Sequence, residues 1–343
     1  MADYPWFKSY DEGVRHSLAP YPDITLLDII AETTREMPDH TFMYFKDRYF
    51  SYKEASRLFE VMASALMASG VRKGDRVASM LLNTPQQLIG AFGTMMAGGI
   101  YVPLNPLYND DELVHTLTTV EAEVIVVWDL LYANVKKIQP RTKIKTVIAT
   151  SLEDYMLPEA KKSHTIPMEK GDVWMDELMG KHAKDPAPAF KPGVNDTAVI
   201  LFSGGTTGAP KGAMISFRNM VAVGLQSIEW NKHGMMSVDD YTMAAMPMFH
   251  SYGFNGVIGS SLGMRSPLAV VPNPRYLDDI IYTIKKVKPA SMPGVPTLFI
   301  NLMEHPEVKS GKVDFTCLKF CLSGAIPIMQ ETKSRWEDRK SVV

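Results

Sequence analysis

The feature that most limits the possible folds is a regular alternation of short apolar segments with longer amphipathic ones between residues 76 and 149. The apolar segments are rich in β-branched and large aliphatic side chains, which favours strands, and the segments between them have helical spacing. We expect strands at 76–82, 100–104, 124–128 and 146–149, and helices at 86–96, 111–118 and 131–138. Apolar strands that alternate with helices predict a mainly parallel sheet that helices cover on both faces.

A second alternation runs from residue 241 to residue 322. Strands are expected at 241–245, 268–271 and 318–322, with helices at 253–264, 277–287 and 297–303. The predicted fold class is therefore α/β, with two similar subdomains that are each built on a mainly parallel sheet. Two such halves would place a ligand between them.

The remaining segments divide the chain. A helix is expected at 25–37, a β-hairpin at 42–50, a helix that starts at Ser51 and ends near Gly70, and a helix that opens at Ser216 and runs to about Trp230. The alternation stops between residues 151 and 196, where prolines recur among mixed lysines and acids. We expect residues 1–150 to form a first α/β subdomain, residues 151–196 a surface connection, and residues 197–343 a second α/β subdomain.

Composition and charge exclude several classes of protein. The 343 residues carry 36 Lys and Arg against 38 Asp and Glu, a net charge of −2, which argues against a nucleic-acid-binding protein. Cys317 and Cys321 have no second cysteine pair beside them, so no zinc site is expected, and so few cysteines suit a reducing cytoplasm. Residues 77–109 carry no charge, but prolines, glycines and amides interrupt them, so no transmembrane segment is expected.

The segment after the strand expected at 197–202 has the composition of a phosphate-binding loop. It contains Ser203, Gly204, Gly205, Thr206, Thr207, Gly208 and Lys211. Glycines let the backbone approach a ligand, successive N–H groups bind anions, and the hydroxyls and the lysine suit a polyphosphate. The order differs from the P-loop of GTPases, because Pro210 precedes the lysine and Gly212 follows it. The alternative is a surface hairpin that binds no ligand.

The order Ser-Gly-Gly-Thr-Thr-Gly-x-Pro-Lys-Gly at 203–212 resembles the phosphate-binding signature of the adenylate-forming superfamily. That superfamily includes acyl-CoA synthetases, coumarate–CoA ligases, beetle luciferases and the adenylation domains of peptide synthetases. The resemblance covers residues from about 25 to about 336 and is strongest to the N-terminal portion of a long-chain fatty-acid–CoA ligase. It implies that ATP activates a carboxylic acid as an acyl-adenylate, and that coenzyme A then takes the acyl group as AMP leaves.

The resemblance also implies roles for particular residues. Residues 203–208 and Lys211 would bind the ATP phosphates, and Lys211 would also act in catalysis. His250, in an uncharged segment rich in Met and aromatic side chains, would position the reacting carboxylate. Phe254 falls where an aromatic side chain often gates the acyl tunnel. The residues expected to lie against adenine and the acyl chain are Ser323, Gly324 and Ala325. Taken alone, His250 would be interpreted as a core histidine bound to a backbone carbonyl.

The segment around His250 also bears on the choice of acid. Its apolar character favours a medium- or long-chain fatty acid or an aromatic acid over acetate. A peptide-synthetase domain would usually offer an aspartate for the α-amino group within this motif, and residues 247–254 contain none. A coumarate-like aryl acid therefore stays an alternative to a fatty acid.

Several motifs of full-length superfamily members do not occur in the 343 residues. The Tyr-Gly-x-Thr-Glu motif, whose glutamate helps to hold Mg²⁺, does not follow Ala325, and the Thr-Gly-Asp motif and the C-terminal domain with its catalytic lysine are also missing. We therefore expect an incomplete large N-terminal domain, for which Mg²⁺ is implied without a nameable protein ligand. The competing hypothesis is a non-catalytic remnant that at most binds nucleotide. A homodimer and a peripheral membrane contact are both left open.

Overall fold

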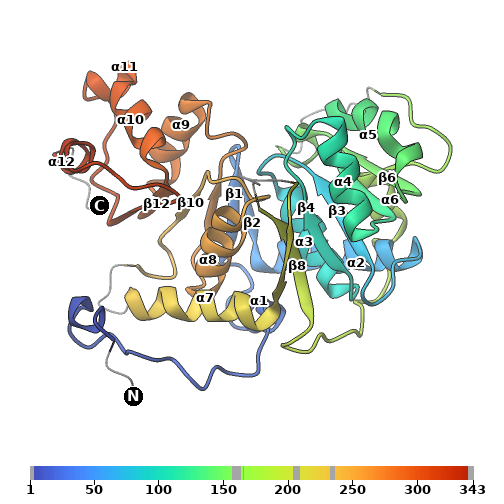
Figure 1. The fold of residues 1–343 in the computed structure, drawn as a ribbon, viewed down its shortest axis with the longest axis horizontal. Helices are drawn as coiled ribbons and strands as arrows, with labels where there is room; N and C mark the ends of the chain where they lie inside the picture. The colour runs from blue at the N-terminus through green and yellow to red at the C-terminus, as the bar shows by residue number, and fades with distance from the viewer. Residues whose placement is uncertain (1–3, 157–163, 165, 204–208, 232–235, 339–343) are drawn as a thin grey trace.

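The computed structural model describes residues 4–156, 164, 166–203, 209–231 and 236–338, which form two sheets flanked by helices (Figure 1). The first sheet has the strand order β7-β6-β5-β3-β4-β8-β9, and every neighbouring pair is parallel except β8 and β9. Its strands are β3 (Arg76–Met80), β4 (Ile100–Pro103), β5 (Val124–Trp128), β6 (Thr146–Thr150), β7 (Val173–Trp174), β8 (Thr197–Phe202) and β9 (Gly212–Ser216). The mainly parallel sheet predicted from residues 76–149 is confirmed.

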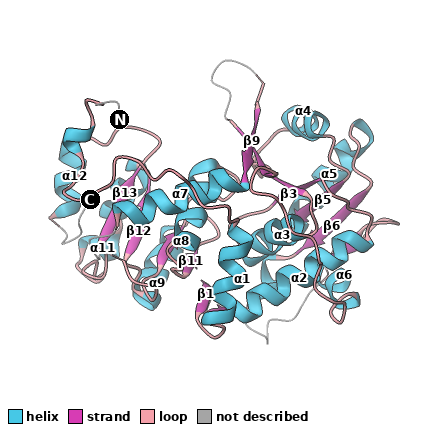
Figure 2. Cartoon of the chain, turned by 90° about the horizontal axis from the view of Figure 1, so that it is seen from below, coloured by secondary structure: helices cyan, strands magenta, loops and turns pink. Residues whose placement is uncertain are grey.

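Helices cover both faces of this first sheet. They are α2 (Tyr52–Ala68), α3 (Pro85–Met96), α4 (Asp110–Val120), α5 (Tyr132–Ile138) and α6 (Met175–Lys181). Successive strand residues point to opposite faces, so Val77 packs in the core with α2 and α3, whereas Ala78 packs in the core with α4 and α5. Figure 2 shows α4 and α5 on one side of β3, β5 and β6, with α2 and α6 on the other. This two-sided burial explains why the strands are continuously apolar.

The second sheet has the strand order β13-β12-β10-β11-β1-β2 and is parallel except for the β1–β2 hairpin. Its strands are β1 (Thr41–Phe45), β2 (Arg48–Ser51), β10 (Thr242–Ala244), β11 (Leu268–Val270), β12 (Ser291–Gly294) and β13 (Phe320–Ser323). The associated helices are α1 (Leu26–Glu36), α7 (Phe217–Trp230), a π-helix (Tyr252–Gly259), α8 (Ser260–Gly263), α9 (Leu277–Val287), α10 (Pro296–Glu304), α11 (Pro306–Lys309) and α12 (Gln330–Glu337). Single 3-10 turns lie at Phe7–Ser9, Asp129–Leu131, Gln139–Arg141 and Leu152–Tyr155.

The two sheets do not follow the boundaries expected at residues 150 and 197. The β1–β2 hairpin completes the second sheet, where Met43 pairs in parallel with Leu268. Strands β8 and β9 complete the first sheet, where Tyr101 pairs with Val199. The segment expected to be a surface connection supplies β7 and α6. The second sheet is therefore assembled from segments that precede and follow the whole first sheet in the sequence. Partners so far apart in sequence leave no local signal of their pairing.

Strands β12 and β9, like β7, were not expected from the sequence, nor was the type of one helix. Strand β12 contains Pro293 and Gly294, two residue types that usually argue against a strand interior. Strand β9 lies directly after the glycine-rich loop and is partly exposed. The helix expected at 253–264 begins as a π-helix, which places one extra residue in its turns. By contrast, α7 begins where predicted, because the Ser216 hydroxyl accepts from the Asn219 N–H at 3.2 Å.

Candidate active site

The predicted phosphate loop joins two antiparallel strands at the carboxyl end of β8. Phe202 pairs with Gly212, and the Ser203 N–H donates to the Lys211 carbonyl at 3.0 Å, which closes the base of the loop. Ser203 and Lys211 are exposed, and no carboxylate of the described residues forms an ion pair with Lys211. Gly204, Gly205, Thr206, Thr207 and Gly208 lie outside the described residues. The base of the loop therefore presents a cation with no acidic partner in the described part of the chain.

A histidine that the sequence did not single out lies beside this loop. His115, on α4, places its Nε2 atom 3.2 Å from the Pro210 carbonyl, immediately before Lys211. A carbonyl only accepts hydrogen bonds, so Nε2 is the donor in this contact. Helix α4 thus holds the end of the loop that carries the lysine.

His250 lies in a tight turn that follows β10. Its N–H donates to the Pro247 carbonyl at 3.0 Å, and its carbonyl accepts from the Phe254 N–H at 2.9 Å. The Tyr252 N–H donates to Nδ1 of the imidazole at 3.2 Å. Because Nδ1 accepts, a neutral imidazole carries its proton on Nε2. His250 is exposed, so this Nε2–H can donate to an incoming carboxylate.

Tyr252 connects the His250 turn to the segment predicted to contact adenine. Its hydroxyl donates to the Leu322 carbonyl at 2.9 Å, and a Cβ on Gly324 would lie 3.1 Å from the Tyr252 ring. Gly324 also donates its N–H to the Gly294 carbonyl at 3.0 Å. Burial raises the pKa of Tyr252 to about 12, so the hydroxyl stays a donor at neutral pH. The structure therefore brings His250 and Gly324 together through one aromatic ring.

The remaining residues predicted for the site are Ser323, Ala325 and Phe254, and they differ in burial. The Ser323 hydroxyl is buried without a hydrogen-bond partner among the described residues, so a bound ligand could satisfy it. Ala325 is exposed and has a φ of 70°, which turns the chain sharply after β13. Phe254 is fully buried, and its ring stacks on Tyr101 at 5.7 Å. It is absent from the lining of the apolar cavity described next, so its role at an acyl tunnel stays a prediction.

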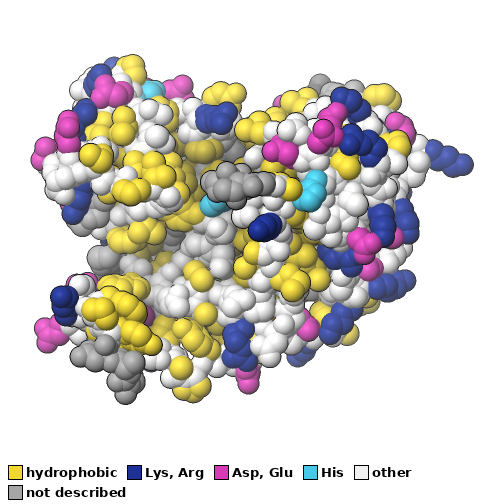
Figure 3. All heavy atoms as spheres, in the orientation of Figure 1, with side chains coloured by type: hydrophobic (Ala, Val, Ile, Leu, Met, Phe, Trp, Pro, Cys, Tyr) yellow, Lys and Arg dark blue, Asp and Glu magenta, His cyan; other side chains and the backbone are white. Residues whose placement is uncertain are grey.

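An apolar cavity of about 500 Å³ lies between α7 and the second sheet. Its walls include Val223, Trp230, Val257, Met264, Pro293 and Leu322. Gly256 also lines it, and a Cβ there would lie 3.1 Å from the Tyr252 ring, so the cavity reaches the residue that holds the His250 turn. Among the described residues that line it, Asp11 is the one with an ionisable side chain. Figure 3 shows hydrophobic side chains around the hollow between the N-terminal arm, beside α7, and the part formed by α9 to α12.

A second, smaller pocket of about 150 Å³ is lined in part by the segment that leads into His250. It is lined by the segments that follow β3, β4, β10 and β11, among them Asn83, Leu107, Pro247, Phe249, Pro272 and Arg275. These segments are the carboxyl ends of parallel strands from both sheets, the usual place for ligands in open α/β sheets. The segment before His250 thus lines this pocket, and the helix after His250 lines the larger apolar cavity.

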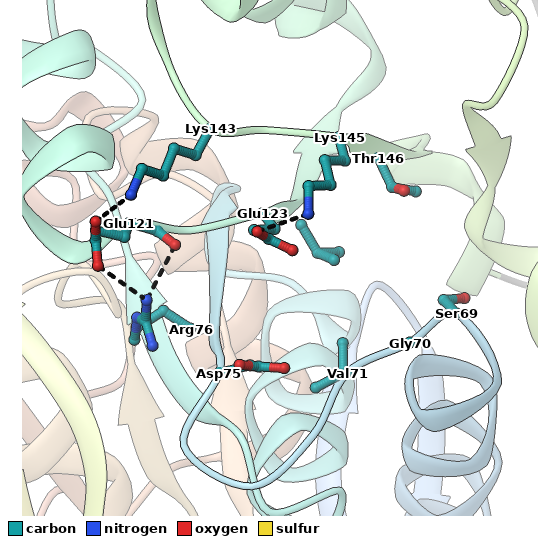
Figure 4. A pocket seen from close by; sticks show the side chains of 11 residues that line it. Ser69, Gly70, Val71, Asp75, Arg76, Glu121, Glu123, Lys143, Lys145 and Thr146 are labelled. Atoms are coloured by element: carbon teal, nitrogen blue, oxygen red, sulfur yellow. Dashed lines mark hydrogen bonds and ion pairs between the residues drawn. The ribbon is translucent and has the colours of Figure 1, made fainter.

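The most polar pocket, of about 410 Å³, has a different location. Figure 4 shows that it lies at the amino ends of strands, and that its cations pair with neighbouring acids. Lys143 and Arg76 both pair with Glu121, and Lys145 pairs with Glu123 at 2.7 Å. The Lys143 ammonium holds the pKa of Glu121 below its ordinary value. Because its cations already have acidic partners, we assign no phosphate-binding role to this pocket.

Comparison with known proteins identifies the family of the chain. The family model described as AMP-binding enzyme matches residues 30–342. The chain belongs to the AMP-binding enzyme family.

Curated relatives of this AMP-binding enzyme include bacterial long-chain-fatty-acid–CoA ligases. The protein of that name from Bacillus subtilis (strain 168) is 31% identical over 345 residues, which cover 97% of this chain and 60% of the relative. The one from Haemophilus influenzae is 27% identical and is matched over 61% of its length. The chain thus spans about three fifths of the length of these relatives and corresponds to their N-terminal portion.

Solved structures show the same fold. An anthranilate CoA ligase in complex with anthranoyl-AMP matches with a TM-score of 0.80 and 18% identity, over 94% of this chain and 59% of that one. A long-chain-fatty-acid–CoA ligase from Archaeoglobus fulgidus matches with a TM-score of 0.78 and 24% identity, over 94% and 62%. The two-sheet α/β architecture of the large N-terminal domain is therefore confirmed.

The Mg²⁺ implied by the resemblance finds no matching donor set in the described part of this AMP-binding enzyme. There, no three His, Cys, Asp or Glu side chains gather so that they could hold a metal ion. We therefore assign no step of the reaction to a metal held by these residues. Among the described residues, no helix is both long enough and apolar enough to cross a bilayer.

Two hydrogen bonds of the candidate site, from Tyr252 and from His115, were not predicted from the sequence. Tyr252 stands inside the motif around His250, but its partner Leu322 lies 70 residues further along the chain. His115 lies 95 residues before Pro210 on a helix whose sequence pattern is ordinary. Only the adjacency of Tyr252 to His250 offered any signal, and it gave no indication of the hydroxyl's partner.

Proposed function

We propose that the protein to which this chain belongs uses ATP and coenzyme A to convert a carboxylic acid to its acyl-CoA, through an acyl-adenylate. One observation carries this proposal: the exposed His250 imidazole lies on a turn that Tyr252 ties to β13, and the segments before and after this turn line a pocket and a larger apolar cavity. Membership of the AMP-binding enzymes supports the nucleotide. The names of its bacterial relatives support an acid–thiol ligase.

In the first half-reaction a carboxylate oxygen attacks the α-phosphorus of ATP. The bond from that phosphorus to the bridging oxygen breaks, and pyrophosphate leaves with the negative charge. Lys211 and the backbone and hydroxyl groups of residues 203–208 would neutralise the phosphate oxygens. The Nε2–H of His250 would hold the carboxylate by a charge-assisted hydrogen bond. Ser323, Gly324 and Ala325 would lie against adenine, where the small side chains and the unpartnered Ser323 hydroxyl can receive it.

In the second half-reaction the sulfur of coenzyme A attacks the carbonyl carbon of the adenylate. The bond from that carbon to the phosphate oxygen breaks, AMP leaves, and the thiol proton passes to solvent. The second pocket, which shares no lining residue with the apolar cavity, would give the thiol a separate approach to the His250 turn. The two substrates of this step would therefore not compete for one channel.

The lining of the larger cavity supports a medium- or long-chain fatty acid. Its apolar side chains would bury methylene groups, each of which contributes about 0.8 kcal/mol when removed from water. The relatives named for long-chain fatty acids support the same choice, and an aryl acid is the alternative to be tested beside it. A substrate of this kind and the cysteine content both suit a cytoplasmic protein.

Exchange of labelled pyrophosphate into ATP by the 343-residue chain, with carboxylic acids of graded length, tests the proposal. We expect exchange that is greatest with medium- or long-chain acids and is lost in His250→Ala but kept in the matched variant His182→Ala. Exchange with amino acids only would overturn it. A folded chain that binds ATP but catalyses no exchange would instead support the nucleotide-binding remnant.

A further inference from the structure

Asn83 lies three residues after β3, and both polar atoms of its side-chain amide form hydrogen bonds with a loop that is distant in the sequence. Its Nδ2 donates to the carbonyls of Met246 at 3.0 Å and Ala245 at 3.2 Å, and its Oδ1 accepts from the Met248 N–H at 2.8 Å. The orientation of the amide is unambiguous, because the carbonyls only accept and the N–H only donates. The residue is 3% exposed, so water does not compete for these bonds.

The loop that Asn83 holds leads directly into the His250 turn. Residues 245–250 form no helix or strand, so their buried backbone groups depend on partners from outside the loop. The Asn83 backbone N–H also donates to the Pro272 carbonyl at 3.3 Å, beside the end of β11. Asn83, which follows a strand of the first sheet, thus contacts two segments associated with the second sheet. They are the loop that precedes His250 and the segment that follows β11.

We propose that Asn83 is a positioning residue for His250: it sets the path of residues 245–248 and thereby the place of the imidazole. Only asparagine supplies a donor and an acceptor on a side chain of this length. An apolar substitute would leave the Met248 N–H and the Met246 carbonyl buried and unpartnered, so the loop would move to satisfy them. The consequence for catalysis rests on the proposed function, whereas the effect on His250 does not.

The experiment compares Asn83→Ala with wild type by nuclear magnetic resonance of ¹⁵N-labelled histidine and by amide hydrogen exchange. In the wild type, the His250 nitrogens should show the tautomer with the proton on Nε2, and the Met248 amide should exchange slowly. In N83A we expect a displaced or mixed His250 signal and Met248 exchange that is at least about tenfold faster, as loss of one buried hydrogen bond predicts. The His250 signal is assigned by its disappearance in His250→Gln.

Gln86→Ala is the matched control, because Gln86 is equally buried and its Nε2 donates to the Ser151 carbonyl at 2.6 Å, on another loop. Q86A should lower stability while leaving the His250 signal unchanged. If N83A does not fold, Asn83→Ser, which is too short to reach both partners, should displace the signal in the same direction. Wild-type His250 signals and Met248 exchange in a folded Asn83 variant would overturn the proposal.

Activity provides a separate readout. If the wild type catalyses exchange, N83A should lower kcat about ten- to hundredfold with a smaller change in KM, whereas Q86A should alter neither. An Asn83 variant with displaced His250 signals but wild-type kcat would overturn the catalytic consequence alone. A wild type without exchange would count against the proposed function and leave the resonance test of Asn83 intact.

Discussion

The hydroxyl of Tyr252 donates a 2.9 Å hydrogen bond to the carbonyl of Leu322, so the turn that carries His250 is fastened to strand β13. Leu322 is followed by Ser323 and Gly324, which are expected to contact adenine. The group that would hold the carboxylate and the segment that would hold the nucleotide therefore move as one unit. This link makes the site sensitive to changes that leave the proposed binding residues themselves intact.

Tyr252→Phe should weaken binding of an acyl-adenylate analogue without unfolding the chain. The substitution removes one hydrogen bond, worth about 0.5–1.5 kcal/mol, which corresponds to a loss of up to about tenfold in affinity. Isothermal titration calorimetry would measure it. Tyr282→Phe is the control, because that hydroxyl donates to Asp47 at 2.6 Å, away from the site. Equal affinities for Y252F and wild type would argue against the link.

Gly253→Ala should destabilise the chain strongly. A Cβ at this position would lie 2.1 Å from the Pro247 carbonyl oxygen, a backbone atom that cannot move without reshaping the His250 turn. We expect a loss of about 2–4 kcal/mol in the free energy of unfolding, measured by urea denaturation. Gly90→Ala, on α3 with no atom within 4 Å of the added Cβ, should instead be neutral or stabilise by up to about 1 kcal/mol.

Lys211→Ala should lower the affinity for ATP about ten- to hundredfold, because the ammonium would lose its charge-assisted contact with phosphate. The affinity of the wild type should fall as salt concentration rises, and that of K211A should fall less. Fluorescence titration with an ATP analogue at two ionic strengths would show both effects. Lys170→Ala is the control, because Lys170 is an exposed lysine that is distant in sequence from the loop, and this variant should behave as wild type.

The chain should lose stability as the pH rises above about 9, the ordinary pKa of a thiol. Burial raises the pKa of the Cys321 thiol from 9.0 to about 11 and raises the pKa of Tyr52, Tyr101 and Tyr155 above their ordinary value of 10.0. The folded state binds these protons more tightly than the unfolded state, so stability is full below pH 9 and falls as pH rises above it. Urea midpoints between pH 7 and pH 11 would measure the decline.

Substitution of cysteine distinguishes the contribution of the thiols to this loss of stability from that of the tyrosines. Burial also raises the pKa of the Cys317 thiol, so the double substitution Cys317→Val and Cys321→Val is needed to remove this contribution; stability should then stay constant up to about pH 10, where the buried tyrosines begin to matter. The tyrosinate absorbance of the buried rings should then appear together with the loss of circular dichroism, since those rings ionise only on unfolding. Ionisation of Tyr101 in a chain that remains folded would contradict this account.

The sequence predicted those parts of the fold that depend on local pattern. The capping serine of α7 and the apolar alternation of β3 to β6 carry their own signals, and both were found where expected. Strand β12 was missed because its residues, Ser-Met-Pro-Gly, are held in the sheet by neighbours and not by propensity. The pairing of β1 with β11 was missed because nothing near Met43 specifies a partner at Leu268.

In the candidate site, too, residues in local motifs could be predicted, whereas contacts between distant segments could not. His250, Ser323, Gly324 and Ala325 stand in recognisable motifs, and the structure brings His250 and Gly324 together through Tyr252. The contribution of Asn83 could not be predicted, because an asparagine before a helix is usually interpreted as a cap. Its bonds to residues more than 160 positions away appear only once both sheets are assembled.

The parallel pairing of β1 with β11 also has a consequence for synthesis of the chain on the ribosome. The β1–β2 hairpin emerges early, yet its partner strand at Leu268–Val270 is translated only after the whole first sheet. Until then β1 presents an unpaired edge, and such edges pair readily with other chains. Slow translation of residues 52–267, or a scarcity of chaperones that shield strand edges, should therefore lower the yield of soluble protein even though the finished fold is unchanged.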